Sequence, residues 1–245
     1  MDGRINETTE QRLKTAVAAT TVVLSHAGIL GYSGHVSLRL PDRSDAFLIQ
    51  PVDDSRAALQ PEAVLTVDLD GTAIAGRPGA KPPREVFIHS EIFRARPDVN
   101  AVLHYHPALA TLFTMVEGRE LAPLRNQAAR WMSGIPVYPD PGHVDSPAKG
   151  RALAAALGPH NAALIRAHGA VLVAEGLKEL FIDAVHFEEN AEAVYRAGPL
   201  KPLAHAELAA FYQQIDRAAH GAKLWTYYAG RAAANGAIPD AWTRI

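Results

Sequence analysis

Hydrophobic and polar positions repeat with two different periods along this chain, and the two periods predict helices and strands in alternation. Apolar residues at helical spacing predict helices over residues 10–30, 85–96, 107–116, 146–157 and 177–197, and a helical tail from about residue 204 to 234. Shorter apolar or alternating runs predict strands over residues 35–40, 47–49, 64–69, 72–74, 101–106, 135–138, 162–165 and 170–174. Asp70-Gly71 between two of these runs is typical of a hairpin turn.

No linker or repeat separates these elements into two cores, so we expect a single domain. Helices that alternate with mostly hairpin-connected strands favour an α/β (α+β) domain with a central, mostly antiparallel sheet flanked by helices. Residues 199–202, which contain two prolines, mark where the tail leaves the body. We therefore expect a body over residues 1–202 and a helical tail over residues 203–245, packed on the same body or on a neighbouring subunit.

Composition excludes several classes of protein. Of the 245 residues, 48% are hydrophobic, and 24 basic side chains nearly balance 26 acidic ones, so global disorder and a nucleic-acid partner are not expected. No apolar run is long enough for a membrane span, and the polar residues 1–11 do not resemble a secretory signal. The absence of cysteine excludes disulfides, thiolate ligands and a cysteine nucleophile. A cytoplasmic protein is the expectation.

Histidine is the residue type that points to chemistry. His104 and His106 stand at i and i+2 of a predicted strand and therefore share a face, where both imidazoles can reach one ion. His168 lies in a turn between two apolar strands, and Glu85 lies at the start of a helix. Each alone is more simply an ordinary turn or first-turn residue, but together they form a set suited to Zn²⁺, Mn²⁺, Co²⁺ or Fe²⁺.

Several stretches together resemble the class II aldolase/adducin family, over roughly residues 11–197. They are Gly34-His35-Val36-Ser37, Glu85, residues 95–107 with His104-Tyr105-His106-Pro107, and Ala167-His168-Gly169. The resemblance implies a three-layer fold and a catalytic domain over residues 1–202, with His104, His106 and His168 as ligands of one divalent metal ion per subunit. Zn²⁺ or Mn²⁺ is expected first, with Co²⁺ and Fe²⁺ as alternatives. It also implies that Glu85 is the acid/base group, and that the protein is a homotetramer with active sites at subunit interfaces.

The expected phosphate pocket is missing. Phosphosugar members of the family carry small hydroxyl residues and a Thr-Gly pair where this chain has His35, Pro51-Val52 and Pro83-Arg84. The chain is more similar to the hydroxy-carboxylate decarboxylases of the family, those acting on carboxymuconate-semialdehyde, dihydroxyphthalate and pyridine-dicarboxylate substrates. This similarity implies substrate binding by His35, Ser55, Arg56 and Arg84, because an arginine fork suits a carboxylate. His89, one helical turn after Glu85, is expected to orient that carboxylate and assist catalysis.

The resulting hypothesis is a metal-dependent lyase of aromatic catabolism. It decarboxylates a hydroxy-substituted, aromatic or muconate-type acid through a metal-stabilised enolate or phenolate, with Glu85 as proton donor. The alternatives are an aldolase for a non-phosphorylated hydroxy-aldehyde or hydroxy-keto acid, a non-haem iron oxygenase, and a metal-free adducin-like interaction module. His143 and His160 are interpreted as ordinary loop histidines, and the tail's Tyr227 and Tyr228 receive no role.

Overall fold

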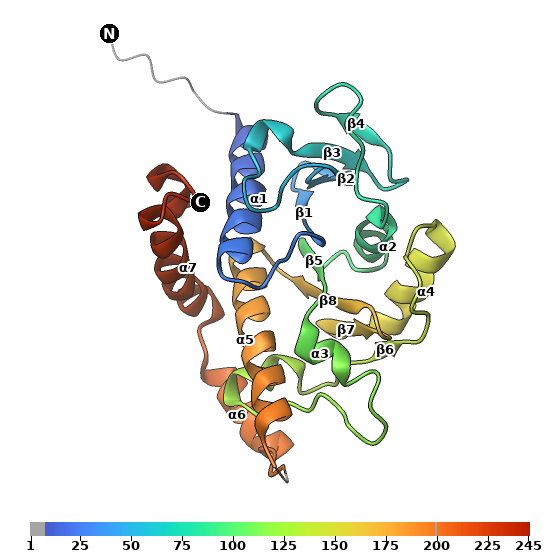
Figure 1. The fold of residues 1–245 in the computed structure, drawn as a ribbon, viewed down its shortest axis with the longest axis vertical. Helices are drawn as coiled ribbons and strands as arrows, with labels where there is room; N and C mark the ends of the chain where they lie inside the picture. Colours follow the sequence, from blue (N-terminus) through green and yellow to red (C-terminus); the bar gives the residue numbers. More distant parts are fainter. Residues whose placement is uncertain (1–7, 199) are drawn as a thin grey trace.

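One eight-stranded sheet organises the molecule, a computed structural model that describes residues 8–198 and 200–245 (Figure 1). The expectations for residues 1–7 and Pro199 lie outside the described residues. The strand order is β4-β3-β2-β1-β5-β8-β7-β6, and every neighbouring pair is antiparallel except β6 and β7. The strands are β1 (His35–Leu40), β2 (Arg43–Ile49), β3 (Leu65–Asp68), β4 (Ala73–Ala75), β5 (Ala101–Tyr105), β6 (Val137–Tyr138), β7 (Ala162–Ile165) and β8 (Gly169–Ala174).

Helices cover both faces of the sheet and make three layers (Figure 1). On one face lie α1 (Thr9–His26), α3 (Ala108–Leu112), α5 (Leu177–Arg196) and α7 (Arg217–Ala234), and on the other lie α2 (Val86–Ala95) and α4 (Pro147–Leu157). The remaining helices are α6 (His205–Gln214) and the short 3₁₀ helices η1 (Pro61–Ala63), η2 (Asn126–Trp131) and η3 (Asp240–Arg244). The expected mostly antiparallel sheet between helices is confirmed.

The two-residue period of β1 and β5 separates the core from the polar face. Val36 and Leu38 of β1 pack in the core beneath α1 and α5, as do Leu103 and Tyr105 of β5. The alternate residues of each strand therefore point to the face covered by α2. On β5 this face receives Val102, which packs in the second core, and then His104.

Three helical predictions need correction, and the simplest is that the helix predicted over residues 107–116 ends at Leu112. The first helix ends at His26 rather than near residue 30, because Gly28 takes φ +75° and the Leu30 amide turns back to the Leu24 carbonyl. The tail is not one helix: it breaks after Gln214, and the Asp216 side chain caps a new helix by accepting a hydrogen bond from the Ala219 amide.

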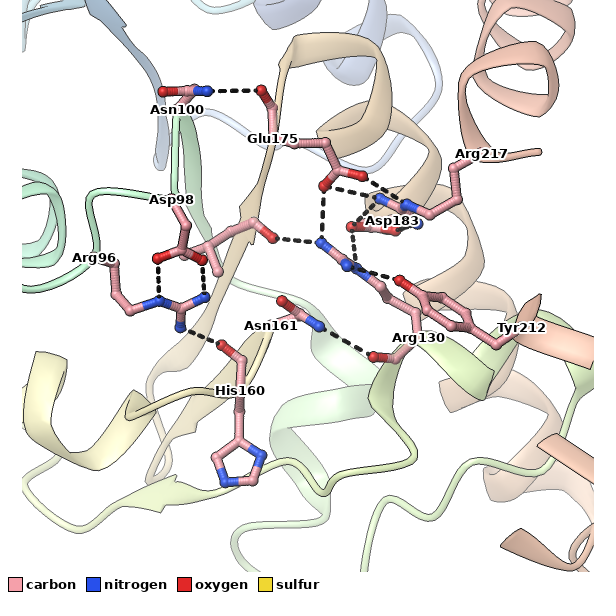
Figure 2. A network of polar contacts seen from close by, with 11 residues as sticks. Arg96, Asp98, Asn100, Arg130, His160, Asn161, Glu175, Asp183, Tyr212 and Arg217 are labelled. Carbon is pink, nitrogen blue, oxygen red and sulfur yellow. Dashed lines mark hydrogen bonds and ion pairs between the residues drawn. The ribbon is translucent and has the colours of Figure 1, made fainter. Parts of the chain in front are cut away.

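The tail packs on the same chain, where α7 lies against α5 and α1. Phe181 of α5 and Trp225 of α7 meet edge to face with ring centroids 5.5 Å apart, an arrangement that contributes about 1 kcal/mol beyond burial. Arg217 at the start of α7 donates to Asp183 of α5 and to Glu175, so ion pairs fasten the same junction (Figure 2). Within the described residues, no helix has the length and apolar character of a membrane span.

Candidate metal centre

Three imidazoles and one carboxylate converge beside the N-terminal end of α2. Glu85, His104, His106 and His168 each offer one donor atom, and these atoms all lie within 4.8 Å of one another. The rings of His106 and His168 stack at 5.1 Å, and His104 meets each of them edge-on. We call these four residues the histidine cluster. The four residues that the sequence predicts for the metal and acid/base roles are thus brought together.

Strand ends and one tight turn deliver the three imidazoles. His104 is the penultimate residue of β5, which ends at Tyr105 rather than at the predicted residue 106, and His106 follows directly before Pro107. His168 lies in the four-residue turn between β7 and β8, which its amide closes by donating to the Ile165 carbonyl. Ala167 in that turn adopts φ 53°, a left-handed conformation that costs energy for any residue with a Cβ atom. The turn therefore stores strain beside the cluster.

Two glycines let the backbone close around the cluster. A Cβ atom at Gly169 would collide with the Tyr105 carbonyl and lie 2.9 Å from His106 Cδ2. A Cβ atom at Gly34 would lie 2.7 Å from the His104 carbonyl, and Gly34 also has φ +99°. Only glycine fits at these two positions, because close approach and, at Gly34, backbone conformation both exclude a side chain.

Glu85 precedes α2 and is held as a carboxylate. Its Oε1 accepts a hydrogen bond from the Val144 amide at 2.9 Å, and its Oε2 lies 3.4 Å from His104 Nε2. Burial acts to raise the pKa of Glu85, but His104, the Val144 amide and His168 outweigh it and lower the pKa to about 2. Glu85 is therefore ionised at neutral pH.

The donor set fits a divalent cation. His104 donates from Nδ1 to the Ala170 carbonyl at 3.1 Å, so Nε2 is the nitrogen on the side of the cluster and the one that can ligate a metal ion. His104 Nε2 is buried and has no hydrogen-bond partner within the described residues. A buried imidazole nitrogen without a partner is costly, and a metal ion would satisfy it. Burial, reinforced by His104 and His168, lowers the pKa of His106 to about 4, so this imidazole is neutral as a ligand must be.

His35 and His89 lie next to the cluster but do not bond to Glu85. His35 of β1 stands opposite His104 in the antiparallel register, with ring centroids 5.1 Å apart. His89 is fully buried on α2, where Nε2 lies 2.7 Å from His35 Nδ1 and Nδ1 lies 2.6 Å from Ser37 Oγ. Both nitrogens of His89 are thus engaged away from Glu85, and its expected hydrogen bond to that carboxylate is not present.

Arg56 is buried beside His35, and most of its N–H groups donate hydrogen bonds to backbone carbonyls. Its Nε donates to the Gly34 carbonyl, and its Nη1 donates to the carbonyls of Val52 and Asp54. Within the described residues Nη2 has no hydrogen-bond partner, and this nitrogen keeps some exposure to solvent. One NH₂ group therefore remains for a ligand, where the sequence predicts a two-pronged fork.

Ser55 and Arg84, two of the predicted binding residues, have exposed side chains. Ser55 is exposed and lines a separate hollow of about 640 Å³, shared with Asp54, Glu62 and Arg77. Arg84 is exposed and pairs with Asp145 at 2.8 Å. Arg84 directly precedes Glu85 in the chain, but the structure gives neither side chain a hydrogen bond or ion pair with the histidine cluster.

His143 is a site residue that the sequence analysis misses. Its Nδ1 lies 3.6 Å from Glu85 Oε1, and its ring centroid lies 5.6 Å from that of His168. More than half of its side chain is exposed, so it stands at the open side of the cluster. Lys149 holds this loop by donating to the His143 carbonyl. No periodicity marks residue 143, because only the path of the loop brings it to Glu85.

Comparisons with known proteins agree with this geometry. Residues 15–195 match the family described as Class II Aldolase and Adducin N-terminal domain. The chain is 30% identical over 209 residues to a 3,4-dihydroxyphthalate decarboxylase of Rhodococcus jostii (strain RHA1), with 79% of this chain and 85% of that protein covered. It is 28% identical over 187 residues to a 3-oxo-tetronate 4-phosphate decarboxylase of Escherichia coli O6:H1 (strain CFT073), with 73% and 84% covered.

A solved structure shares the fold. The L-fuculose 1-phosphate aldolase from Glaciozyma antarctica PI12 superposes with a TM-score of 0.78 at 20% identity, over 96% of this chain and 93% of that one. The three-layer arrangement, the histidine cluster and the sequence match all agree on one assignment. The chain belongs to the class II aldolase and adducin family.

Proposed function

We propose that this protein is a metal-dependent decarboxylase of a hydroxy-substituted carboxylic acid, aromatic or muconate-type. The single observation that carries the proposal is the convergence of Glu85 with three imidazoles, one of which presents a buried, unpartnered Nε2. We further propose zinc or manganese as the ion, one per subunit, and a homotetramer with active sites at subunit interfaces.

The likeness to a dihydroxyphthalate decarboxylase supports a substrate with a hydroxyl beside a carboxylate. The second relative acts on a phosphorylated acid, so the assay below includes both phosphorylated and non-phosphorylated acids. On this chain, His35 lies next to the cluster and Arg56 donates to the carbonyl of the preceding residue, Gly34, and both side chains suit a carboxylate. Arg84 is bound to Asp145, and Ser55 faces another hollow, so we leave both out of the proposed binding site.

Loss of carbon dioxide leaves an electron pair on the substrate, and the site must stabilise it. A divalent metal held by His104, His106 and His168 supplies Lewis-acid stabilisation of that charge. Arg56 Nη2 and His35 bind the carboxylate and orient the carbon–carbon bond that breaks.

Glu85 moves the proton. Because it is ionised in the free protein, the proton it delivers is one that it first accepts from the substrate's hydroxyl group. When the carbon–carbon bond breaks, carbon dioxide leaves, the electron pair stays on the substrate carbon, and Glu85 gives its proton to that carbon. The product leaves with its oxygen ionised and regains a proton from water, so one proton is consumed for each carbon dioxide released.

A carbon dioxide release screen tests the proposal. The zinc-loaded and manganese-loaded proteins are incubated with ortho-hydroxy aromatic acids, muconate-type acids and one phosphorylated hydroxy acid. We expect metal-dependent release of carbon dioxide from the hydroxy acids and none from the same acids without the hydroxyl group. Release of an aldehyde instead of carbon dioxide would identify an aldolase, and a requirement for oxygen would identify an oxygenase. Either result would overturn the proposal.

A further inference from the structure

Ser37, His89 and His35 form a chain of buried side chains that ends beside the histidine cluster. Ser37 and His89 have no exposed surface, and His35 has 4%. The chain runs from hydroxyl to imidazole to imidazole through contacts of 2.6 Å and 2.7 Å, and His89 is its middle member. Side-chain alternation on β1 puts Ser37 and His35 on the same face, opposite α2.

Only the outer end of this chain is open. Within the described residues His35 Nε2 has no hydrogen-bond partner, and this nitrogen keeps some exposure to solvent. Its ring lies beside that of His104, with ring centroids 5.1 Å apart, so the free nitrogen belongs to a ring that adjoins the histidine cluster. At the other end Ser37 has no route to solvent. The chain therefore cannot carry protons from bulk water to the pocket.

A chain of this kind has two neutral arrangements, because each hydrogen bond contains one proton. In the first, Ser37 donates to His89 Nδ1, His89 Nε2–H donates to His35 Nδ1, and His35 Nε2 carries a proton. In the second, every bond is reversed and His35 Nε2 presents a lone pair. The rotatable hydroxyl of Ser37 permits either arrangement. The ligand at His35 Nε2 decides between them.

Arg56 indicates what that ligand is. Its Nε donates to the carbonyl of Gly34, the residue before His35, and its Nη2 is the one nitrogen left free. Because this hydrogen bond places a guanidinium next to the backbone of His35, an anionic oxygen is the favoured ligand for the two residues. Such an oxygen accepts hydrogen bonds and selects the first arrangement.

We infer that Ser37 and His89 hold His35 as the Nε2–H tautomer, so that His35 and Arg56 together bind the substrate's carboxylate. This inference rests on the proposed function for the class of substrate. It makes His35 a binding residue, and it makes His89 and Ser37 positioning residues that act through His35. His89 therefore serves substrate recognition rather than the proton chemistry of Glu85.

Nitrogen NMR of the histidine side chains tests the tautomers directly. The zinc-loaded protein, labelled with ¹⁵N-histidine, is titrated with salicylate, an ortho-hydroxy aromatic carboxylate. The signals are assigned with His35→Gln and His89→Gln. We expect His35 and His89 both as Nε2–H tautomers when salicylate is bound, with His35 Nε2 shifted by the titration. Nδ1–H tautomers at both residues, or a His35 signal that salicylate leaves unchanged, would overturn the inference.

Binding by matched serine variants tests the positioning role. Ser37→Ala removes the donor at the closed end, and we expect salicylate to bind about tenfold more weakly, because a hydrogen bond to a charged group is weakened. Ser90→Ala is the control, since Ser90 is equally buried beside His89 and its hydroxyl has no partner in the described part of the chain. Equal affinities for the two variants would contradict the inference.

Two histidine variants give a readout that misfolding would not mimic. Gln at position 89 can still place an amide N–H near His35 Nδ1, whereas Phe preserves only the ring shape beside Phe47. We expect His89→Gln to bind salicylate more tightly than His89→Phe and to raise KM with little change in kcat. A fall in kcat at constant KM would instead assign His89 to the proton transfer.

These measurements separate the inference from the proposed function. If no acid releases carbon dioxide but the tautomers and the serine variants behave as expected, the function fails and the carboxylate site stands. If carbon dioxide is released but Ser37→Ala binds salicylate like wild type, the inference fails alone.

Discussion

The histidine cluster and the junction of the tail are both built from ionisable side chains, but their polar atoms differ in how far they are hydrogen-bonded to one another. At the junction, which we call the tail network, Arg130 and Arg217 share the carboxylates of Asp183 and Glu175 through contacts of 2.8 to 3.1 Å (Figure 2). Arg130 also donates to the Tyr212 hydroxyl. In the cluster, His104 Nε2 has no hydrogen-bond partner in the described part of the chain, and three imidazole rings crowd together.

The difference separates a structural site from a binding site. In the tail network opposite charges satisfy each other, so no further ligand is needed. In the cluster a carboxylate faces several imidazoles whose pKa values are lowered by burial, which is an arrangement that folding alone does not favour. Cluster atoms without a hydrogen-bond partner, such as His104 Nε2, can gain binding energy from a ligand, whereas the paired atoms of the tail network cannot.

The largest expected effect concerns the proton-transfer group of the cluster. Glu85→Gln keeps an oxygen that can accept from the Val144 amide but cannot carry a proton to the substrate, so turnover should fall by about 10²- to 10⁴-fold. Turnover and metal content are measured on the same sample. Full activity in this variant would remove Glu85 from the mechanism, and loss of the metal would show that it acts as a ligand.

In the tail network, the matching change should cost stability instead of activity. Asp183→Ala leaves Arg130 and Arg217 without their shared buried carboxylate, and the free energy of unfolding should fall by about 3 to 5 kcal/mol. Urea unfolding measures it. Metal content per folded molecule should remain that of wild type. A loss below about 1 kcal/mol would mean that solvent or Glu175 compensates for the missing charge.

Adding the ion should stabilise the cluster specifically. A metal that binds only the folded state at 100 times its dissociation constant raises the free energy of unfolding by about 2.7 kcal/mol. We expect such a rise on adding Zn²⁺ to the metal-free protein, its reversal by a chelator, and a much smaller rise in His104→Gln. Asp183→Glu, which retains the charge of the tail network, should respond to Zn²⁺ like wild type. An equal rise in the His104 variant would place the ion elsewhere.

The smallest effect lies behind the cluster, where Tyr105 donates to Glu188 at 2.9 Å. Burial raises the pKa of Glu188 above its usual value of 4.5, although the hydrogen bond from Tyr105 acts the other way. Because the folded pKa is the higher one, ionisation costs stability above the unfolded pKa and costs nothing below it. Glu188→Gln should therefore stabilise the protein at pH 7, by less than about 1 kcal/mol, and the gain should disappear below pH 4.5. Thermal unfolding across this pH range checks it; a gain that persists in acid would contradict it.

Local patterns predict the elements that form the site. The alternation over residues 35–40 and the apolar run at 162–165 agree with the bounds of β1 and β7. The i and i+2 spacing of His104 and His106 also predicts that the two imidazoles meet, and their ring centroids lie 5.0 Å apart although β5 ends at Tyr105. Helix ends are less predictable: the break before Asp216 depends on a capping side chain that helical periodicity does not reveal.

Local sequence patterns do not predict contacts between distant segments. Helical spacing puts Glu85 and His89 on one face, but the sequence does not tell that His89 turns to Ser37 and His35 across the sheet interface. His143 reaches Glu85 through an irregular loop, and Arg130 meets Asp183 through packing of η2 on α5. Each of these depends on tertiary structure that no spacing along the chain encodes.

The alternation along β1 has a consequence for protein design. Val36 and Leu38 anchor one side of the strand, while His35 and Ser37 serve the other. The proposed carboxylate recognition and the packing of the core are therefore assigned to alternate positions of one six-residue strand. Recognition of a different acid can therefore be sought by changes at position 35, while the packing beneath α1 and α5 and the hydrogen bonds of Arg39 to backbone carbonyls are left as they are.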